Sequence, residues 1–367
     1  MKKIVLTVGA RPNFMKAAPL YRVLQSINRF STLLLHTGQH YDYEMSRAFF
    51  EDLELPEPDY HLQVGSDTQA AQTARIMIGF EKVLDREKPQ LVVVFGDVNS
   101  TLACALTAKK MGVPVAHVEA GLRSFDETMP EEINRKLTDA LADLLFTPSA
   151  EGSKNLEREA VAGERIFFVG NIMIDSLRAV GERIEPAFEA DLLAEYKVTP
   201  RDYGLITLHR PANVDDQANL QAVFRSLDRI SRQVKLIFPV HPRTLKNMEE
   251  AGIEGGTKSG LVITEPLRYK EFIALERNAG FVLTDSGGIQ EETTYLGIPC
   301  FTLRPNTERP VTIEQGTNRL VTLDNLEAEV LKVNPAAASS ANPQRNRPPL
   351  WDGKTAERIG EILTDIL

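Results

Sequence analysis

Short apolar runs alternate with longer mixed segments along the whole chain, and most runs end in a turn rich in Gly, Asn, His or Pro. Each run has the length of a buried strand, and each mixed segment has the length of a helix that covers a sheet. The regular succession favours an α/β fold built on doubly wound parallel sheets. Strands are predicted at residues 2–8, 33–37, 91–95, 113–118, 166–169, 205–208, 236–240, 262–267, 281–284 and 300–303, with a further strand ending at 146–149, and helices at 14–26, 44–50, 68–87, 172–203, 219–233, 289–296 and 354–367.

One further helix is predicted to begin at Pro130, since proline is favoured in a first helical turn. Apolar residues recur in it at helical spacing, so they are expected to form the buried stripe, with Glu131 and Arg135 on the opposite side. Glu131 has two interpretations: it could close a capping box with Thr128, or it could add a third acid to the edge of the sheet. The expected stripe consists of Ile133, Leu137, Ala140, Leu141 and Leu144.

The length of 367 residues predicts more than one core, because single cores stop growing at about 250 to 300 residues. We place an N-terminal Rossmann-like domain at residues 1–170 and a second at 171–350, followed by a helix within 351–367. Residues 334–349 have the composition of a linker.

Composition excludes several classes of protein. No apolar segment approaches the roughly 18 residues that span a bilayer, and the N-terminus runs into a Gly-Ala-Arg-Pro turn, which predicts a cytoplasmic protein without a membrane partner. A net charge of -9 argues against a nucleic-acid partner. Cys104 and Cys300 lie among apolar residues, so neither a disulfide framework nor a cysteine metal site is expected.

The segment after the strand at 281–284 is the strongest candidate for binding a phosphate. A Ser-Gly-Gly turn opens directly into a helix, where unpaired backbone N–H groups and the positive end of the helix dipole face an anion. Ser286 adds a hydroxyl donor, and Gly287 and Gly288 let the backbone approach the ligand. The alternative is a helix N-cap with glycines chosen for chain geometry.

Acids and cations lie where the strands of the first half end. Asp97 and Glu119 follow strands that are consecutive in sequence, although Asp97 could instead cap a helix and Glu119 could pair with Arg123. Arg11 and Lys16 stand next to a helix N-terminus, where cations are unfavourable unless an anion compensates them. The spaced glycines of a dinucleotide site are absent, so no nicotinamide cofactor is expected.

The second half has cations at the ends of its strands. His209 and His241 both follow predicted strands, each with an arginine beside or near it, and Arg309 adds to a cationic rim that faces the Ser-Gly-Gly turn. The histidine spacing fits no HExxH-type pattern, so no metal is expected. Acids on one domain and phosphate binders on the other, across a cleft, suit a nucleotide sugar.

The chain resembles the non-hydrolysing UDP-N-acetylglucosamine 2-epimerase family over nearly its whole length. The family implies a GT-B fold, a homodimer, no cofactor, and a C-terminal helix that returns to the first domain. The resemblance is carried, in this order, by GARPNFMKAAPL, TGQHYDYEMS, GDVNSTLA, HVEAGLRSFDETMPEEINR, TLHRPANVD, PVHPRT, LTDSGGIQEE and NTERP.

The resemblance also implies roles for individual residues. Three matching carboxylates are expected to be catalytic, with His209 as a further catalytic residue, while Glu292 would bind ribose. The catalytic carboxylates would be Asp97, Glu119 and Glu131. The diphosphate and sugar would be bound by Arg11, Lys16, Arg135, His241 and Arg309. A phosphate group would be bound by Ser286, Gly287 and Gly288. The chain departs from the family at Pro211-Ala212, so the family's roles in that loop are not carried over in detail. It also departs at Tyr41-Asp42-Tyr43, so allosteric activation is not predicted.

The expected reaction inverts C2 of UDP-N-acetylglucosamine to give UDP-N-acetylmannosamine. Anti elimination of UDP would leave 2-acetamidoglucal, which takes a proton on its other face before UDP returns, and neighbouring acids can divide the roles of acid and base. A related UDP-diacetamido uronic acid is an alternative substrate. The alternative activities are those of a GT-B glycosyltransferase, a hydrolysing epimerase and a non-catalytic sensor of nucleotide sugars.

Overall fold

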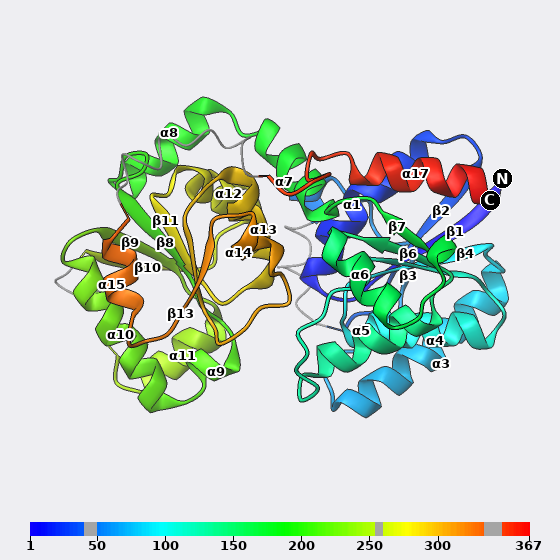
Figure 1. Ribbon diagram of the computed structural model, residues 1–367, viewed down its shortest axis with the longest axis horizontal. Coiled ribbons are helices and arrows are strands. Elements are labelled where there is room, and N and C mark those ends of the chain that lie inside the picture. Colours follow the sequence, from blue (N-terminus) through cyan, green and yellow to red (C-terminus); the bar gives the residue numbers. More distant parts are fainter. Residues whose placement is uncertain (40–49, 254–259, 334–346) are drawn as a thin grey trace. The chain divides into compact units, whose positions relative to one another are not determined.

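The computed structural model describes residues 1–39, 50–253, 260–333 and 347–367. The chain divides into two compact units, Met1–Arg178 with Pro349–Leu367, and Ala179–Pro348 (Figure 1). Each unit is built on one parallel sheet with helices around it, which confirms the predicted α/β class with two doubly wound sheets. Most of the helix predicted at 44–50 lies outside the described residues.

The first unit contains a seven-stranded parallel sheet in the order β3-β2-β1-β4-β5-β6-β7. Its second strand in chain order lies beside the first, and the chain then crosses to the other side of β1, which is the doubly wound pattern. The strands are β1 (Lys2–Val8), β2 (Phe30–His36), β3 (Tyr60–His61), β4 (Leu91–Phe95), β5 (Val115–Val118), β6 (Leu144–Thr147) and β7 (Ile166–Phe168), and the helices are α1 (Arg11–Ser26), α3 (Gln69–Glu87), α4 (Asn99–Lys110), α5 (Pro130–Leu141), α6 (Ala150–Arg158) and α17 (Thr355–Ile366). Helix α7 (Ile172–Glu182) begins in this unit and ends in the second.

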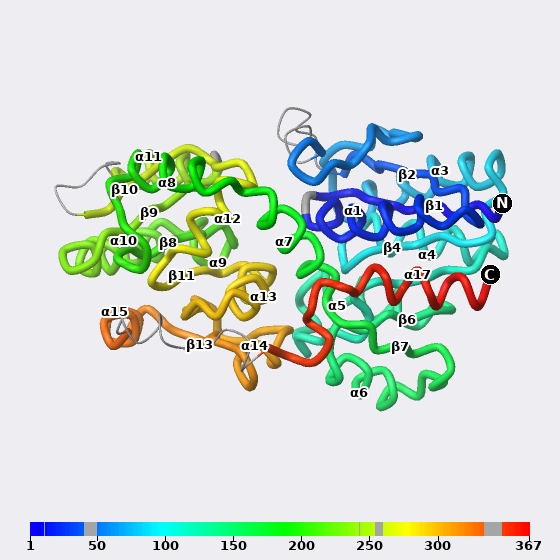
Figure 2. The backbone as a smooth tube through the Cα atoms, turned by 90° about the horizontal axis from the view of Figure 1, so that it is seen from above, coloured from blue at the N-terminus to red at the C-terminus, as the bar shows by residue number. Residues whose placement is uncertain are grey.

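The C-terminal helix α17 belongs to this first unit, where it lies beside α1 (Figures 1 and 2). The Arg29 guanidinium of the turn after α1 donates to the Thr364 carbonyl at 3.0 Å. At the other end of α17, the buried Asp175 carboxylate accepts from the backbone N–H groups of Thr355 and Ala356 at 3.2 and 2.8 Å. These bonds satisfy two of the orphan donors of the helix and fix its start.

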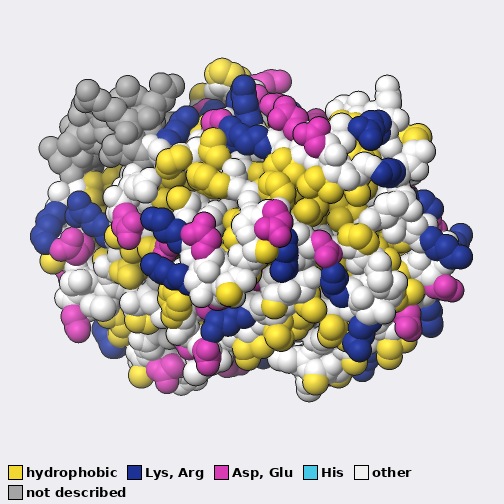
Figure 3. Space-filling model, turned by 45° about the vertical axis from the view of Figure 1, so that its right-hand side comes forward, with side chains coloured by type: hydrophobic (Ala, Val, Ile, Leu, Met, Phe, Trp, Pro, Cys, Tyr) yellow, Lys and Arg dark blue, Asp and Glu magenta, His cyan; other side chains and the backbone are white. Residues whose placement is uncertain are grey.

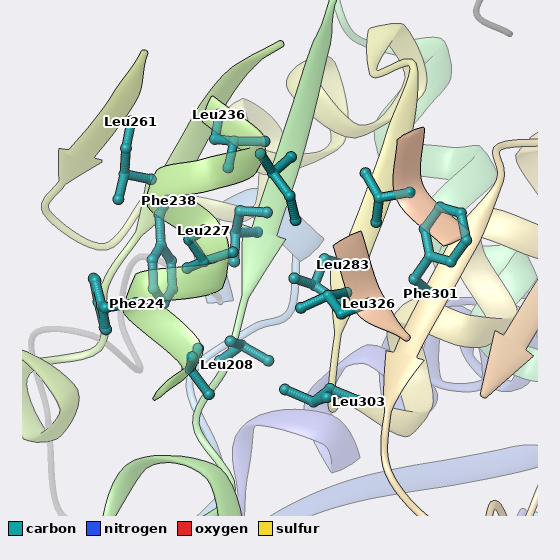
Figure 4. Packing of buried hydrophobic residues seen from close by; sticks show 14 of the residues in the cluster. Leu208, Phe224, Leu227, Leu236, Phe238, Leu261, Leu283, Phe301, Leu303 and Leu326 are labelled. Carbon is teal, nitrogen blue, oxygen red and sulfur yellow. The ribbon is translucent and has the colours of Figure 1, made fainter. Parts of the chain in front are cut away.

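The second unit contains a six-stranded parallel sheet in the order β10-β9-β8-β11-β12-β13. Leu227, Phe238 and Leu283 belong to a core in which the Phe224 and Phe238 rings stack 6.0 Å apart (Figure 4). The strands are β8 (Tyr203–Thr207), β9 (Lys235–Pro239), β10 (Leu261–Thr264), β11 (Phe281–Thr284), β12 (Cys300–Leu303) and β13 (Asn318–Val321), and the helices are α8 (Pro186–Glu195), α9 (Pro211–Val214), α10 (Gln217–Ser231), α11 (Pro242–Glu250), α12 (Tyr269–Asn278), α13 (Gly287–Leu296), α14 (Val311–Glu314) and α15 (Leu326–Leu331).

Helix α5 turns the opposite face inward from the one predicted. Ile133 and Leu137 are 49% and 48% exposed, Ala140 is exposed as well, and Leu144 lies in β6 instead of the helix. The buried residues of α5 are Glu132, Asn134, Arg135, Thr138 and Asp139. The predicted stripe is wrong because α5 lies over polar loops at the end of the sheet, where its charged side chains find partners.

Charged side chains of both signs are interspersed over the face drawn in Figure 3. Within the described ranges, no helix is both long enough and apolar enough to cross a bilayer. Cys104 and Cys300 are buried free thiols, and burial raises the pKa of each to about 12, so both remain protonated at neutral pH.

Candidate active site

A buried ion pair lies at the carboxyl end of the first sheet. Lys16 of α1, which begins at Arg11, pairs with the Glu119 carboxylate after β5, and their side chains are only 7% and 6% exposed. Gly96 leaves room for this pair, since a Cβ at that position would lie 2.8 Å from Lys16 Nζ and 3.2 Å from Glu119 Oε2. Glu119 itself has a φ of 74°, which costs about 1 to 3 kcal/mol for a non-glycine residue and is typical of functional sites.

A second pair stands one residue further along the β4 turn. The Arg135 guanidinium donates to Asp97 Oδ2 at 2.5 Å, and its other arm pairs with Glu132. The Asp97 side chain is 28% exposed and therefore open to a ligand, whereas Arg135 is buried. Glu131 is exposed in the first turn of α5, one turn before Arg135 on the same side of the helix. The structure thus gathers Asp97 and Arg135 beside the Lys16–Glu119 pair.

A buried histidine supports the loops that carry these acids. His117 of β5 is fully buried, with Nδ1 2.7 Å from Asp139 Oδ1 and Nε2 2.8 Å from the Gly96 carbonyl oxygen. Asp139 also accepts from the Gly121 N–H at 3.0 Å and from Arg123 at 2.7 Å. Burial alone would raise the pKa of Asp139, but His117 and Arg123 hold it below its ordinary value. This network ties the β4 and β5 loops to α5.

The pairing of Glu119 with Arg123, which the sequence left open, is not realised. Arg123 pairs with Asp139 and Glu159, and Glu119 pairs with Lys16. The Glu132 carboxylate, one position after Glu131, accepts from the Ser124 N–H at 2.9 Å, so Glu132 holds the entry to α5.

In the second unit the Ser-Gly-Gly turn follows β11 directly. Ser286 is the N-cap residue of α13, yet its side chain makes no capping hydrogen bond to the helix. Gly287 is held against Arg309, because a Cβ there would lie 2.3 Å from Arg309 Nη1. A buried guanidinium therefore stands at the N-terminus where Gly287 and Gly288 begin α13, which makes the turn a suitable anion site.

The cations around this turn are organised by one buried carboxylate. Glu308 lies 2.5 Å from Arg309, 2.9 Å from Arg304 and 3.8 Å from Arg210. Burial would raise the pKa of Glu308, but the three guanidinium groups hold it far below its ordinary value. Arg309 also pairs with Glu291 at 2.9 Å. The carboxylates fix the arginines in place.

His209 and His241 follow β8 and β9, whose carboxyl ends share one edge of the sheet with β11. His209 Nδ1 lies 3.1 Å from Asp285 Oδ1, and its side chain is 50% exposed. Burial would raise the pKa of Asp285, but His209 and the Asn213 amide keep it below its ordinary value. His241 is exposed and accepts from the Arg243 N–H at 3.2 Å as the N-cap of α11.

Glu292 lies one turn into α13 and is buried. The Tyr269 hydroxyl of α12 donates to its Oε1 at 2.8 Å. Among the described residues, no group of three His, Cys, Asp or Glu side chains is arranged to hold a metal ion.

Sequence reasoning missed several of these residues. Asn13 bridges the turn, accepting from the Gly9 N–H at 3.1 Å and donating to the Phe95 carbonyl at 2.9 Å. Glu132, His117 and Asp285 were missed as well. Asp285 stands directly before Ser286, at a strand end, and that position was a usable signal.

Gly287→Ala tests the close approach of Arg309 to the Ser-Gly-Gly turn. The added methyl would displace the guanidinium, so we expect UDP affinity to fall about 10- to 100-fold, the equivalent of one hydrogen bond to a charged group. Isothermal titration calorimetry with UDP measures the change. The control is Gly181→Ala, where an added Cβ meets nothing within 4 Å. Wild-type affinity in Gly287→Ala would contradict this arrangement.

Together, two parallel α/β units with acids at one sheet edge and an anion-binding turn at the other define a nucleotide-dependent enzyme of the GT-B fold class. A family model described as UDP-N-acetylglucosamine 2-epimerase matches residues 22–364. The chain belongs to this family, whose members are isomerases, and it is a 2-epimerase.

Two relatives and one solved structure illustrate the similarity. The chain is 43% identical over 373 residues to the UDP-N-acetylglucosamine 2-epimerase of Methanocaldococcus jannaschii, covering 99% of each chain. It is 40% identical over 322 residues to the UDP-2,3-diacetamido-2,3-dideoxy-D-glucuronate 2-epimerase of Pseudomonas aeruginosa, covering 87% of this chain and 88% of the relative. The crystal structure of the M. jannaschii UDP-GlcNAc 2-epimerase in complex with UDP-GlcNAc and UDP superposes with a TM-score of 0.87 at 41% identity, covering 99% of each chain.

Proposed function

We propose that this enzyme interconverts UDP-N-acetylglucosamine and UDP-N-acetylmannosamine by elimination and re-addition of UDP. The observation that carries the proposal is the pair of carboxylates Asp97 and Glu119, each held by a cation at the edge of the first sheet. The M. jannaschii relative, 41% identical, is a UDP-GlcNAc 2-epimerase solved with UDP-GlcNAc and UDP.

The chemistry requires a base and an acid on opposite faces of the sugar. A carboxylate takes the proton from C2, the C2–H electrons form the C1=C2 bond of 2-acetamidoglucal, and UDP departs with the C1–O electrons. A protonated carboxyl then delivers a proton to the other face of C2, while a UDP oxygen attacks C1. Asp97, Glu119 and Glu131 are the groups we assign to these transfers, with His209 as a further catalytic residue.

The remaining residues are assigned to binding. Ser286, Gly287 and Gly288 would bind phosphate at the start of α13, and Glu292 would accept hydrogen bonds from ribose. Cations stabilise the diphosphate as it leaves, because charge develops on its oxygen in the transition state. The cations assigned to the diphosphate and sugar are Arg11, Lys16, Arg135, His241 and Arg309.

Proton NMR of the protein with UDP-N-acetylglucosamine in heavy water tests the proposal. We expect UDP-N-acetylmannosamine to appear and both sugars to carry deuterium at C2. Release of free sugar would instead identify hydrolysis, and retention of protium at C2 during epimerisation would overturn the elimination mechanism.

A UDP-diacetamido uronic acid is the second candidate substrate. The 40% identity to the P. aeruginosa enzyme, over 87% of this chain, supports it. The same NMR assay with this sugar in place of UDP-N-acetylglucosamine compares the two, and the substrate with the larger kcat/KM identifies the preference.

We also propose that the chain works as a homodimer through α5. Ile133 and Leu137 lie one turn apart on this helix and are about half exposed, and Phe125 of the preceding loop is 70% exposed. An apolar helix face of this kind is typical of an interface. A second copy of the chain is the occupant that the family resemblance implies.

Leu137→Asp places a charge in the centre of this face. We expect the wild type to have the mass of a dimer by light scattering after size exclusion, and Leu137→Asp to have the mass of a monomer. Leu245→Asp is the matched control, because Leu245 is 42% exposed on α11 of the other unit. A dimeric Leu137→Asp, or a monomeric wild type, would contradict the proposed interface.

A further inference from the structure

Glu276 of α12 is a fully buried carboxyl that none of the roles above uses. In the described ranges, no N–H or O–H donor reaches either of its oxygens, and the neighbouring group that acts on it is the buried Glu292 carboxylate of α13. Burial, and then the charge of Glu292, raise the pKa of Glu276 well above its ordinary value. Two buried carboxyls in contact do not both ionise, so Glu276 is neutral and carries a proton.

Helix α12 presents a second donor to the same carboxylate. Tyr269 and Glu276 are seven residues apart, which is two helical turns, and therefore lie on one face of α12. The Tyr269 hydroxyl donates to Glu292 Oε1 at 2.8 Å. A carboxylate held by two neutral donors keeps its charge and has a fixed orientation, because each bond restricts rotation of the side chain.

We propose that Glu276 is a positioning residue for nucleotide recognition: its protonated carboxyl donates to Glu292 and, with Tyr269, orients the Glu292 carboxylate toward the ribose hydroxyls. This inference rests on the proposed function, in which Glu292 accepts hydrogen bonds from the ribose of UDP. Glu276 itself touches no ligand. It acts through Glu292.

Calorimetric titration with UDP and with 2′,3′-dideoxyuridine 5′-diphosphate separates this role from a general structural one. We expect the wild type to bind UDP about 10- to 100-fold more tightly than the dideoxy ligand, as a hydrogen bond to a charged group provides. Glu276→Leu is expected to reduce UDP affinity about tenfold and to leave the dideoxy affinity unchanged, since only the ribose contact depends on Glu292.

The variants are chosen so that folding does not confuse the result. Leucine fills a similar volume and removes a buried carboxyl that burial disfavours, so Glu276→Leu should fold at least as stably as the wild type. Glu276→Gln keeps an N–H donor toward Glu292 and is expected to bind both ligands like the wild type. Glu292→Gln should lower the preference for UDP over the dideoxy ligand by weakening the acceptor itself.

The possible outcomes test separately the proposed function, the role of Glu292 and the role of Glu276. A wild type that fails to bind UDP overturns the proposed function, and a wild type that binds both ligands equally overturns the role of Glu292 and this inference with it. If the wild type discriminates and Glu276→Leu discriminates equally well, or loses affinity for both ligands alike, Glu276 does not position Glu292. If Glu276→Gln binds the two ligands as Glu276→Leu does, Glu276 does not act as a hydrogen-bond donor to Glu292.

Discussion

Asp97→Asn is expected to slow epimerisation by about 10²- to 10⁴-fold, the usual contribution of general acid–base catalysis, with UDP affinity nearly unchanged. Asparagine has the shape of aspartate and still accepts a hydrogen bond, but it cannot exchange a proton at neutral pH. Arg135 retains Glu132 as a charged partner, so the local fold should persist. Asp97 is partly exposed, and its replacement buries no new unpaired charge.

Steady-state rates with UDP-N-acetylglucosamine and calorimetric titration with UDP measure the two effects separately. Asp85→Asn, at an exposed position of α3, is the control and should keep wild-type turnover. Equal losses of turnover and of UDP affinity in Asp97→Asn would remove the catalytic assignment.

Replacement of a carboxylate by its amide has different consequences at Glu131 and at Glu119. Glu131 is exposed, so Glu131→Gln should also lower turnover far more than UDP affinity. Glu119→Gln removes the negative charge that faces the buried Lys16 ammonium, and breaking such a pair costs about 3 to 5 kcal/mol. For Glu119 we therefore compare Lys16→Met with Glu119→Gln against Lys16→Met alone, because Lys16 is also assigned to the diphosphate and its own loss has to be subtracted.

Hydrophobic pattern was sufficient to predict most strands of both sheets, but not the edge strands β3 and β13. Strands such as β4 are apolar throughout because both faces of a parallel sheet are covered, and this produces an unbroken run that is visible in the sequence. The turns that follow the strands could be predicted as well, because each begins where an apolar run ends. Asp97, Glu119, His209 and Ser286 each stand a few residues after such a run.

The orientation of α5 could not be predicted in this way. The periodicity rule assumes that a helix covers an apolar core, whereas α5 covers strand β5 and the loop after it, where His117, Gly121 and Ser124 offer polar partners. Its charged face is buried because those partners compensate the desolvation of each side chain. Nothing in the local sequence distinguishes Glu131, which is exposed, from Glu132, which is buried.

Pairings between residues distant in sequence were also beyond sequence reasoning. Glu276 and Glu292 belong to different helices, and only the fold brings their carboxyls together. The position of Arg309 against Gly287 was easier to anticipate, because both residues follow strands that are neighbours in a parallel sheet. No comparable signal in the sequence indicated that the Glu308 carboxylate would hold Arg309 in place.

Glu308→Gln is expected to destabilise the second unit by about 3 to 5 kcal/mol at pH 7, the cost of breaking a buried ion cluster. Glu308 is 4% exposed and is surrounded by Arg210, Arg304 and Arg309, which would repel one another without it. Urea unfolding followed by circular dichroism, with hydrogen exchange on peptides of α13 and β12, measures the loss. Glu314→Gln at an exposed position of α14 is the control and should change stability by less than about 0.5 kcal/mol.

The dependence on pH distinguishes this ion cluster from simple packing. The arginines depress the pKa of Glu308 in the folded state, so its stabilisation is fully present above the unfolded value of about 4.3 and is lost as the pH falls toward the folded value. The stability difference between wild type and Glu308→Gln should therefore narrow by about 1.4 kcal/mol for each pH unit below 4. A difference of the same size at pH 7 and pH 3 would mean that Glu308 stabilises the unit by packing and that its charge is not what holds the arginines together.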